Sequence, residues 1–253
     1  MRRAFRVLVV DDDEAMVRTL ADILRMKGME ALTAFSAEQA RRKILGNDID
    51  CVICDVRMPD EDGVALYLNL KKRAPNLPFL LMTAYASDEV IQEGLREGIL
   101  GVLTKPLNID AFLALCQELQ RHHSLLIIDD DPIFREALGE TLRARGYRVL
   151  EILNPAQVEE AIRERRCGVV LLDLKLPGLS GIDLLRRLRA RQLPSRVILM
   201  TAYAEELKEE IREGLELGAE TCLIKPFEIQ ELEDELRQIR SKAARDLLAG
   251  SWE

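Results

Sequence analysis

Aspartate, threonine and lysine residues occur in the same order twice along this chain of 253 residues. The two sets are Asp11, Asp12, Asp55, Thr83 and Lys105, and then Asp129, Asp130, Asp173, Thr201 and Lys225. Carboxylates that are crowded together repel one another, which raises the free energy of the site unless a cation binds. A hard divalent ion with oxygen ligands, such as Mg²⁺, relieves this repulsion and can bridge to a phosphoryl oxygen. A lysine charge and a threonine hydroxyl can bind the same group, so these residue types predict phosphoryl transfer.

The two sets belong to an internal repeat that covers nearly the whole chain. Asp55 returns as Asp173, 118 residues later, and the segment 82–86 returns letter for letter as 200–204. In the last third of each copy the offset becomes 120 residues, because the second copy has a two-residue insertion after Ala204. A period of this length indicates duplicated domains rather than a solenoid.

Each copy is expected to alternate strands and helices. Apolar runs predict strands in the first copy at Arg6–Val10, Glu30–Ala34, Cys51–Cys54, Phe79–Met82 and Gly101–Leu103. These runs are continuous rather than alternating, as a parallel strand covered on both faces requires. Helix signals lie between them, such as a capping box at Ser36 and Gln39 and a helix-ending glycine at Gly28. Five βα units per copy predict an α/β fold with one doubly wound sheet in each of two domains, 1–122 and 123–253.

The residues whose side chains could take part in the reaction all follow expected strands. The acidic pair Asp11 and Asp12 follows the first strand, Asp55 the third, Thr83 the fourth and Lys105 the fifth. Functional groups of an open parallel sheet gather beyond the carboxyl ends of its strands. We therefore expect one site per copy at this edge, with the third aspartate of each triplet near a helix N-terminus instead.

In this order and spacing the residues resemble the response-regulator receiver family, twice. The matching motifs are the acidic pair, Asp-x-x-Met-Pro-x-x-x-Gly around Asp55, Asp-x-x-Leu-Pro-x-x-x-Gly around Asp173, Thr-Ala after the fourth strand and Lys-Pro after the fifth. Each motif alone is weak, but the ordered set found twice makes a chance match improbable. The resemblance implies two flavodoxin-like (βα)5 domains, each with a five-stranded parallel sheet of order 2-1-3-4-5.

The resemblance also implies a function in two-component signal transduction. The chain would be a response regulator, a phosphoprotein that accepts phosphoryl groups at Asp55 and Asp173 rather than a classical enzyme. The donor would be a histidine kinase or a histidine phosphotransfer protein of a phosphorelay, and self-dephosphorylation would be slow. By position, the implied Mg²⁺ ligands are Asp11, Asp12, Asp55 and the backbone carbonyl of Arg57 in copy one, and Asp129, Asp130, Asp173 and the backbone carbonyl of Lys175 in copy two.

The sequence departs from the family at one place in each copy. Many receivers carry an aromatic residue three positions before the lysine, and Val102 and Cys222 stand there instead. This puts the usual output switch in question without touching the expected phosphorylation site. A receiver-shaped but inactive pair is the main competing interpretation. A phosphatase with an aspartyl nucleophile would need a second aspartate where Arg57 and Lys175 stand.

Two further motifs are interpreted as structural. Cys51 and Cys54 form a CxxC, but residues three apart on a strand point to opposite faces and cannot share a metal. We expect buried thiols there. His122 and His123 lie at the junction of the two copies, outside any helical hairpin that would carry a phosphorylated histidine, and a solvated linker is expected.

Composition narrows the partners and the compartment. The formal net charge of −8 argues against direct nucleic-acid binding, because a phosphate-binding surface needs a basic excess. The chain contains no run of about eighteen apolar residues, so no membrane span is expected. Five thinly spread cysteines, an odd number, fit free thiols in a reducing cytoplasm. We expect output through protein–protein contacts. The alternative is the sensory front of a longer effector, such as a transcription factor or a nucleotide cyclase.

The end of the second copy carries an unusual helix. It is expected from Glu228 to about Leu248, roughly two turns longer than its counterpart in copy one. Beyond Ser241 the helix outruns its own domain, yet it keeps the apolar residues Ala243, Ala244, Leu247, Leu248 and, further on, Trp252. A solvated helix end would not carry such a stretch. A homodimer through this helix is therefore the favoured hypothesis. Packing against the first receiver is the rival, and a lead-in to a further domain is a third alternative.

Overall fold

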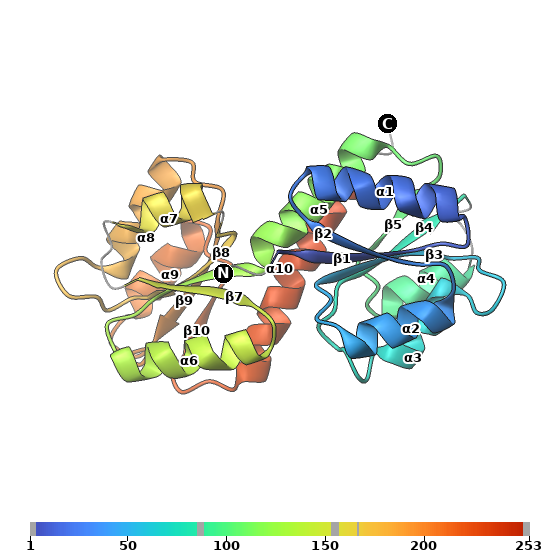
Figure 1. The fold of residues 1–253 in the computed structure, drawn as a ribbon. Helices are drawn as coiled ribbons and strands as arrows, with labels where there is room; N and C mark the ends of the chain where they lie inside the picture. Colours follow the sequence, from blue (N-terminus) through green and yellow to red (C-terminus); the bar gives the residue numbers. More distant parts are fainter. Residues whose placement is uncertain (1–3, 85–88, 153–156, 166, 250–253) are drawn as a thin grey trace. The chain divides into compact units, whose positions relative to one another are not determined.

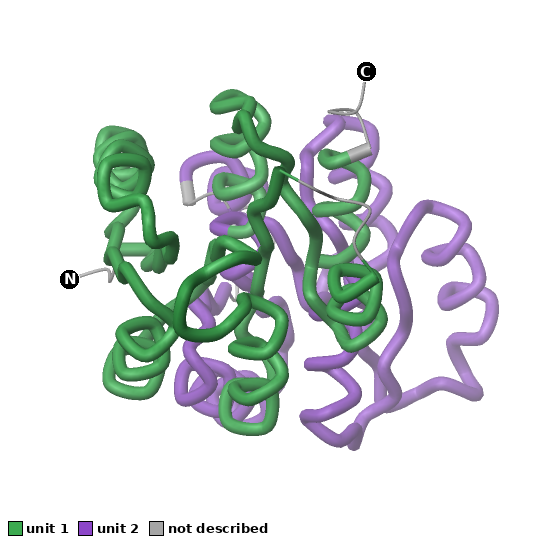
Figure 2. Tube along the Cα trace, turned by 90° about the vertical axis from the view of Figure 1, so that its right-hand side faces the viewer, with its two compact units in different colours: residues 1–119, 240–253 green, residues 120–239 purple. Residues whose placement is uncertain are grey.

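The computed structural model describes residues 4–84, 89–152, 157–165 and 167–249. The chain forms two compact units, shown in different colours in Figure 2. Unit 1 comprises residues 1–119 together with 240–253, and unit 2 comprises residues 120–239. The two units differ from the domains expected at 1–122 and 123–253 mainly in the last residues of the chain, which group with unit 1.

Unit 1 contains one parallel sheet, and every strand begins at the residue that the sequence indicated. Its strands are β1 (Arg6–Val10), β2 (Glu30–Ala34), β3 (Cys51–Asp55), β4 (Phe79–Thr83) and β5 (Gly101–Thr104). Neighbouring strands pair in the order β2-β1-β3-β4-β5. Both the fold class and the order of strands are thus confirmed for this unit.

Helices cover both faces of this sheet, as Figure 1 shows. They are α1 (Glu14–Met26), α2 (Ala37–Gly46), α3 (Gly63–Leu70), α4 (Glu89–Glu97) and α5 (Ile109–His122). One core cluster lies between the sheet, α1 and α5, and a second lies between the opposite face of the sheet and α2 to α4. This double cover explains why the strands are apolar without alternation.

Local sequence signals set the helix ends in unit 1. Asp13 caps α1 by accepting hydrogen bonds from the backbone N–H groups of Ala15 and Met16. Ser36 accepts a hydrogen bond from the backbone N–H of Gln39, as the capping box predicts. Gly28, after the end of α1, has a φ of +79°, a left-handed conformation that glycine adopts at little cost.

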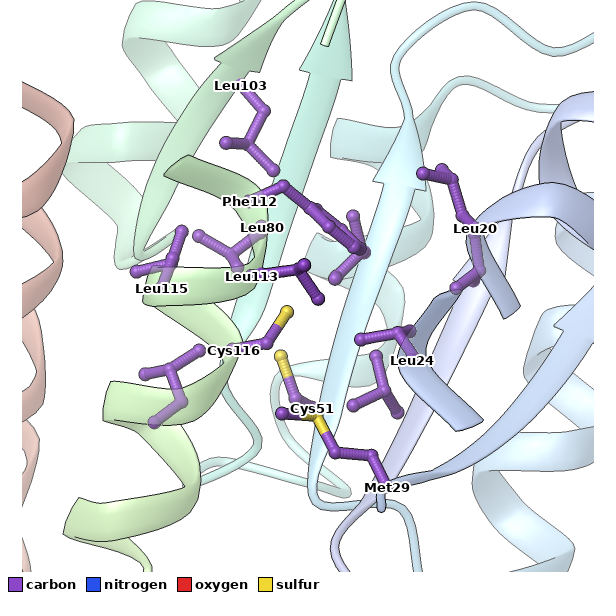
Figure 3. Close-up of a cluster of buried hydrophobic side chains, with 14 of the residues drawn as sticks. Leu20, Leu24, Met29, Cys51, Leu80, Leu103, Phe112, Leu113, Leu115 and Cys116 are labelled. Carbon is purple, nitrogen blue, oxygen red and sulfur yellow. The ribbon is translucent and has the colours of Figure 1, made fainter. Parts of the chain in front are cut away.

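The two cysteines of the CxxC lie on opposite faces of β3, as expected. Cys51 belongs to the cluster under α1 and α5, and Cys54 to the cluster on the other face. Figure 3 shows the Cys51 sulfur directed toward that of Cys116 from α5, among leucine side chains. Burial raises the pKa of both the Cys51 and the Cys54 thiol well above the ordinary value, so these are structural thiols.

Unit 2 repeats the architecture. Its strands are β6 (Ser124–Ile128), β7 (Arg148–Ile152), β8 (Val169–Asp173), β9 (Arg196–Thr201) and β10 (Thr221–Ile224), paired in parallel in the order β7-β6-β8-β9-β10. This is again the expected order of strands. Its helices are α6 (Pro132–Ala144), α7 (Val158–Arg165), α8 (Gly181–Ala190), α9 (Lys208–Glu216) and α10 (Ile229–Ala249).

The two histidines at the junction are buried, so the expectation of a solvated linker is wrong. His122 is the last residue of α5, and β6 begins two residues later at Ser124. The His123 ring stacks on Tyr147, with 5.6 Å between the ring centroids. A helix that runs directly into a buried strand leaves no exposed linker for these side chains.

The C-terminal helix is as long as expected, but its apolar end is already covered. Residues 240–249 of α10 belong to unit 1, where Ala244 and Leu248 join the core cluster under α1 and α5. The approach to the sheet is close: a Cβ on Gly101 would lie 2.3 Å from Cδ1 of Leu248. The rival hypothesis, packing against the first receiver, therefore describes this segment. Trp252 lies outside the described residues.

Among the helices of the described ranges, none combines the length and the apolar character that a bilayer-spanning segment needs.

Candidate functional site

The topology brings the expected residues of unit 1 to one edge of the sheet. Asp55 and Thr83 are the last residues of β3 and β4, while Asp11 and Lys105 directly follow β1 and β5. Asp55 is in register with Met82, one residue before Thr83. Because all five strands are parallel, these ends meet at the carboxyl edge, where open α/β sheets place their sites.

The first acidic cluster has the donor set of a divalent cation site. Carboxylate oxygens of Asp11, Asp12 and Asp55 all lie within 4.8 Å of one another. Asp11 and Asp55 are buried, whereas Asp12 is exposed. The Nζ of Lys105 lies 2.7 Å from Oδ2 of Asp11 and 2.5 Å from Oδ1 of Asp55. The lysine thus bridges two of the carboxylates, beside the position that a cation would occupy.

Burial and hydrogen bonds shift the pKa values of Asp55 and Lys105. It raises the pKa of Asp55, and the hydrogen bond from Lys105 only partly offsets that rise. The negative charge of Asp11 raises the pKa of Asp55 further. For Lys105, burial acts to lower the pKa, but the hydrogen bonds to Asp11 and Asp55 outweigh it and leave the pKa raised. The lysine therefore keeps its positive charge at neutral pH.

Unit 2 has the same cluster with different contacts. Carboxylate oxygens of Asp129, Asp130 and Asp173 lie within 4.8 Å of one another. The Nζ of Lys225 lies 2.6 Å from Oδ2 of Asp129 and 2.8 Å from Oδ2 of Asp173. Burial raises the pKa of Asp129, against the hydrogen bond from Lys225.

Thr83, Thr201 and the residues that follow Asp55 and Asp173 lie at the same edges of the two sheets. Thr83 and Thr201 are both buried at the ends of their strands. The backbone N–H of Arg57 donates to Oδ2 of Asp55 at 2.9 Å, and that of Lys175 donates to Oδ1 of Asp173 at 3.2 Å. These bonds hold the loops after the acceptors against the clusters. Metal ligation by the two backbone carbonyls stays a prediction.

Val102 and Cys222, which stand three residues before the lysines, pack against the apolar cores of their units. Val102 on β5 is buried among the apolar side chains under α2 to α4. Cys222 on β10 packs against the matching cluster of unit 2, and burial raises the pKa of its thiol to about 11. Neither residue has an aromatic ring that could rotate toward the threonine of its site.

The second site has further neighbours, of which sequence reasoning missed Phe134 and Arg135. The Nζ of Lys175 lies 3.7 Å from the ring centroid of Tyr203, and that of Lys225 lies 4.4 Å from the ring centroid of Phe134. Buried Arg135 donates from Nη1 to the backbone carbonyl of Asp129 at 2.7 Å. A comparison of the two copies could have pointed to Phe134 and Arg135, because the first copy has neither an aromatic nor a charged residue at the equivalent positions.

Comparison with known proteins agrees with this geometry. The model of the response regulator receiver domain family matches residues 7–117 and again 125–237. A response regulator receiver protein of Anaeromyxobacter sp. (strain Fw109-5) is 29% identical over 232 residues, which is 90% of this chain and 92% of that protein. Sporulation initiation phosphotransferase F of Bacillus subtilis (strain 168) is 38% identical over 117 residues, 46% of this chain and 93% of that protein.

Solved structures of response regulators are also among the matches. A crystal structure of a two-component system response regulator/GGDEF domain protein is 24% identical, with a TM-score of 0.44, and the match covers 96% of this chain and 98% of that one. Since the family model covers most of the sequence in two separate matches, the chain belongs to the response regulator receiver family and contains two receiver domains in tandem. Units 1 and 2 are called the first and the second receiver from here on.

Proposed function

We propose that both receivers are active phosphoacceptors, with Asp55 and Asp173 as the acceptor residues. The observation that supports this most strongly is that each unit brings the three aspartates and the lysine together at one edge of its sheet. In each, a buried acceptor carboxylate lies beside an acidic pair and under a lysine whose Nζ bridges two carboxylates. Inactive receivers usually lack the acceptor aspartate, an acidic partner or the lysine, and both copies keep all three.

In the proposed reaction an acceptor oxygen attacks the phosphorus atom of a phosphohistidine. The bond from that oxygen to phosphorus forms as the bond from phosphorus to the imidazole nitrogen breaks, and the nitrogen keeps the electron pair. Lys105 or Lys225 neutralises charge on the phosphoryl oxygens, and the hydroxyl of Thr83 or Thr201 donates a hydrogen bond to one of them.

The acidic clusters suit Mg²⁺, which receiver domains generally bind at acidic residues. In the first receiver Asp11, Asp12, Asp55 and the Arg57 carbonyl would hold the ion. In the second the set would be Asp129, Asp130, Asp173 and the Lys175 carbonyl. When bound, Mg²⁺ supplies charge neutralisation for the phosphoryl oxygens. The short distances within each carboxylate set support this assignment.

The donor would be a histidine kinase or a histidine phosphotransfer protein, and output would go through contacts with other proteins. Slow loss of the phosphoryl group is part of the proposal, because the Nζ of Lys175, two residues after Asp173, lies over the ring of Tyr203. A homodimer through the C-terminal helix stays a prediction; of the apolar residues in the described part of that stretch, only Leu247 is exposed.

Phosphorylation with a small donor tests the proposal directly. The full chain is incubated with acetyl phosphate and Mg²⁺, and intact-mass spectrometry counts the phosphoryl groups. Two groups are expected on the unaltered chain, one on Asp55→Asn, one on Asp173→Asn and none on the double variant. A well-studied receiver serves as the positive control. If that control is modified and this chain is not, the proposal is wrong.

A further inference from the structure

One aromatic ring lies against the active-site lysine of the second receiver, and a second ring packs on the first. The Nζ of Lys225 lies 4.4 Å from the centroid of the Phe134 ring, within the range of a cation–π interaction. The Phe227 ring meets the Phe134 ring edge-on, with 5.9 Å between centroids and an angle of 84° between planes. Both rings also pack against the apolar core of the second receiver. The contacts with Phe227 and with the core therefore fix the orientation of the Phe134 ring, whose face lies toward the ammonium group of Lys225.

The first receiver has no ring at either position. The repeat places Met16 where the second receiver has Phe134, and Leu107 where it has Phe227. Both are partly buried against the core, so they fill a similar space. The side chain of Lys105 is 25% exposed and that of Lys225 only 12%. The two lysines make the same kind of carboxylate contacts but differ in what lies on their other side.

A lysine at a transfer site must stay directed at the position where the phosphoryl oxygens arrive. Its four-carbon side chain is flexible, and fixing it costs conformational entropy. In the second receiver the ammonium group is held by Asp129, by Asp173 and by the Phe134 ring. A ring face attracts a cation through its quadrupole but forms no hydrogen bond with it. The N–H donors of the ammonium thus remain free to exchange a carboxylate for a phosphoryl oxygen.

We propose that Phe134 is a positioning residue of the second receiver, whose ring holds the ammonium group of Lys225 beside Asp173 for the incoming phosphoryl group. Phe227 supports it by fixing the orientation of that ring. The proposal rests on phosphorylation of Asp173 as the function of this site. The first receiver performs the same reaction with a less ordered lysine.

The test uses chains in which only Asp173 can accept, that is, the Asp55→Asn background. Initial rates of phosphorylation by acetyl phosphate with Mg²⁺ are followed by intact-mass spectrometry. Phe134→Met, which installs the residue of the first receiver, should lower the rate about three- to tenfold, as expected for loss of a partly desolvated cation–π contact. Phe134→Tyr keeps a ring and should retain most of the rate. Thermal unfolding of each variant controls for folding.

A double-mutant cycle separates positioning from simple packing. In a Lys225→Met chain, followed over a longer incubation, Phe134→Met should have no further effect, because the ring then has no cation to hold. The reciprocal pair Met16→Phe with Leu107→Phe, tested in an Asp173→Asn chain, should raise the rate at Asp55.

The possible outcomes distinguish this inference from the proposed function. An equal rate in Phe134→Met, or the same fold-loss with and without Lys225, would overturn positioning while phosphorylation of Asp173 stands. Absence of any phosphorylation of Asp173 in the Asp55→Asn chain would overturn both.

Discussion

The two receivers have the same set of site residues, but the side chains that pack around these residues differ. In the second, side chains around the site differ from those of the first: Phe134 lies against the lysine, Phe227 packs on Phe134, and Arg135 donates a hydrogen bond to the Asp129 carbonyl. In the first, the difference lies at the far end of β5, where Gly101 lets Leu248 of α10 reach the core. After duplication, the residues that define the chemistry stayed alike while the support around them diverged. Variants that exchange residues between the copies can therefore test each difference separately.

The largest expected effect concerns the C-terminal segment of the first receiver. Leu248 is 8% exposed and belongs to its core, whereas the neighbouring Leu247 is 37% exposed. Leu248→Ala should lower the stability of the first receiver by about 2–4 kcal/mol, and Leu247→Ala by less than about 0.5 kcal/mol. Hydrogen exchange read separately on peptides of each receiver measures this. Equal effects of the two variants would mean that Leu248 does not contribute to that core.

A smaller effect is expected from exchanging Gly101 and Thr221, which occupy equivalent positions in β5 and β10. Gly101→Thr places a Cβ 2.3 Å from Cδ1 of Leu248. Because that atom ends a flexible side chain, we expect a loss of about 1–2 kcal/mol in the first receiver. Thr221→Gly should cost the second receiver less than about 1 kcal/mol. Urea unfolding with hydrogen exchange compares the loss of stability in the two variants. A larger loss in Thr221→Gly than in Gly101→Thr would contradict the close approach of α10 to Gly101.

The lifetime of the phosphoryl group gives a third comparison. In the second receiver the Nζ of Lys175 stacks 3.7 Å from the ring centroid of Tyr203, beside Asp173. This pair should shield the acyl phosphate from water, so Tyr203→Ala is expected to speed dephosphorylation of Asp173 about two- to fivefold. Tyr203→Phe keeps the ring and is the matched control. Tyr85, the counterpart in the first receiver, lies outside the described residues. Decay that is unchanged or slower in Tyr203→Ala would refute the shielding.

The smallest effect concerns pH. Burial raises the pKa of Asp55 above its ordinary value of 3.8, so the folded first receiver binds more protons than the unfolded chain just above that pH. Its stability therefore falls as the pH rises through this window. Without divalent ions, Asp55→Asn should modestly raise the melting temperature at neutral pH, and the gain should vanish near pH 3.8. Asp129→Asn should act likewise in the second receiver. A lower melting temperature in both variants at neutral pH would contradict this.

Much of the fold follows from the sequence because its signals are local. A continuous apolar run between turn residues predicts each buried parallel strand, and the expected start residues hold for all five strands of the first receiver. The grouping of Asp11, Asp55 and Lys105 also follows, since residues after parallel strands meet at one edge. These inferences need only the period of the pattern and the direction of the strands.

The remaining features depend on contacts between distant segments. The apolar spacing around Ala244 and Leu248 shows that this stretch must be covered, but the same spacing suits a second copy and the first receiver equally. His122 and His123 carry no periodic signal that would reveal their burial. Phe134 and Lys225, which are in contact, lie 91 positions apart in the sequence. A single aromatic residue in the first turn of a helix does not indicate which residue it contacts.

The placement of Leu248 also bears on the order in which the chain can fold during synthesis. The first receiver is translated first, and its sheet needs nothing beyond Thr104. Its core, however, includes Leu248, which follows the whole second receiver in the sequence. The interior of the first receiver can therefore close only after the second receiver has been translated. A nascent first receiver would carry exposed apolar surface throughout the translation of the second.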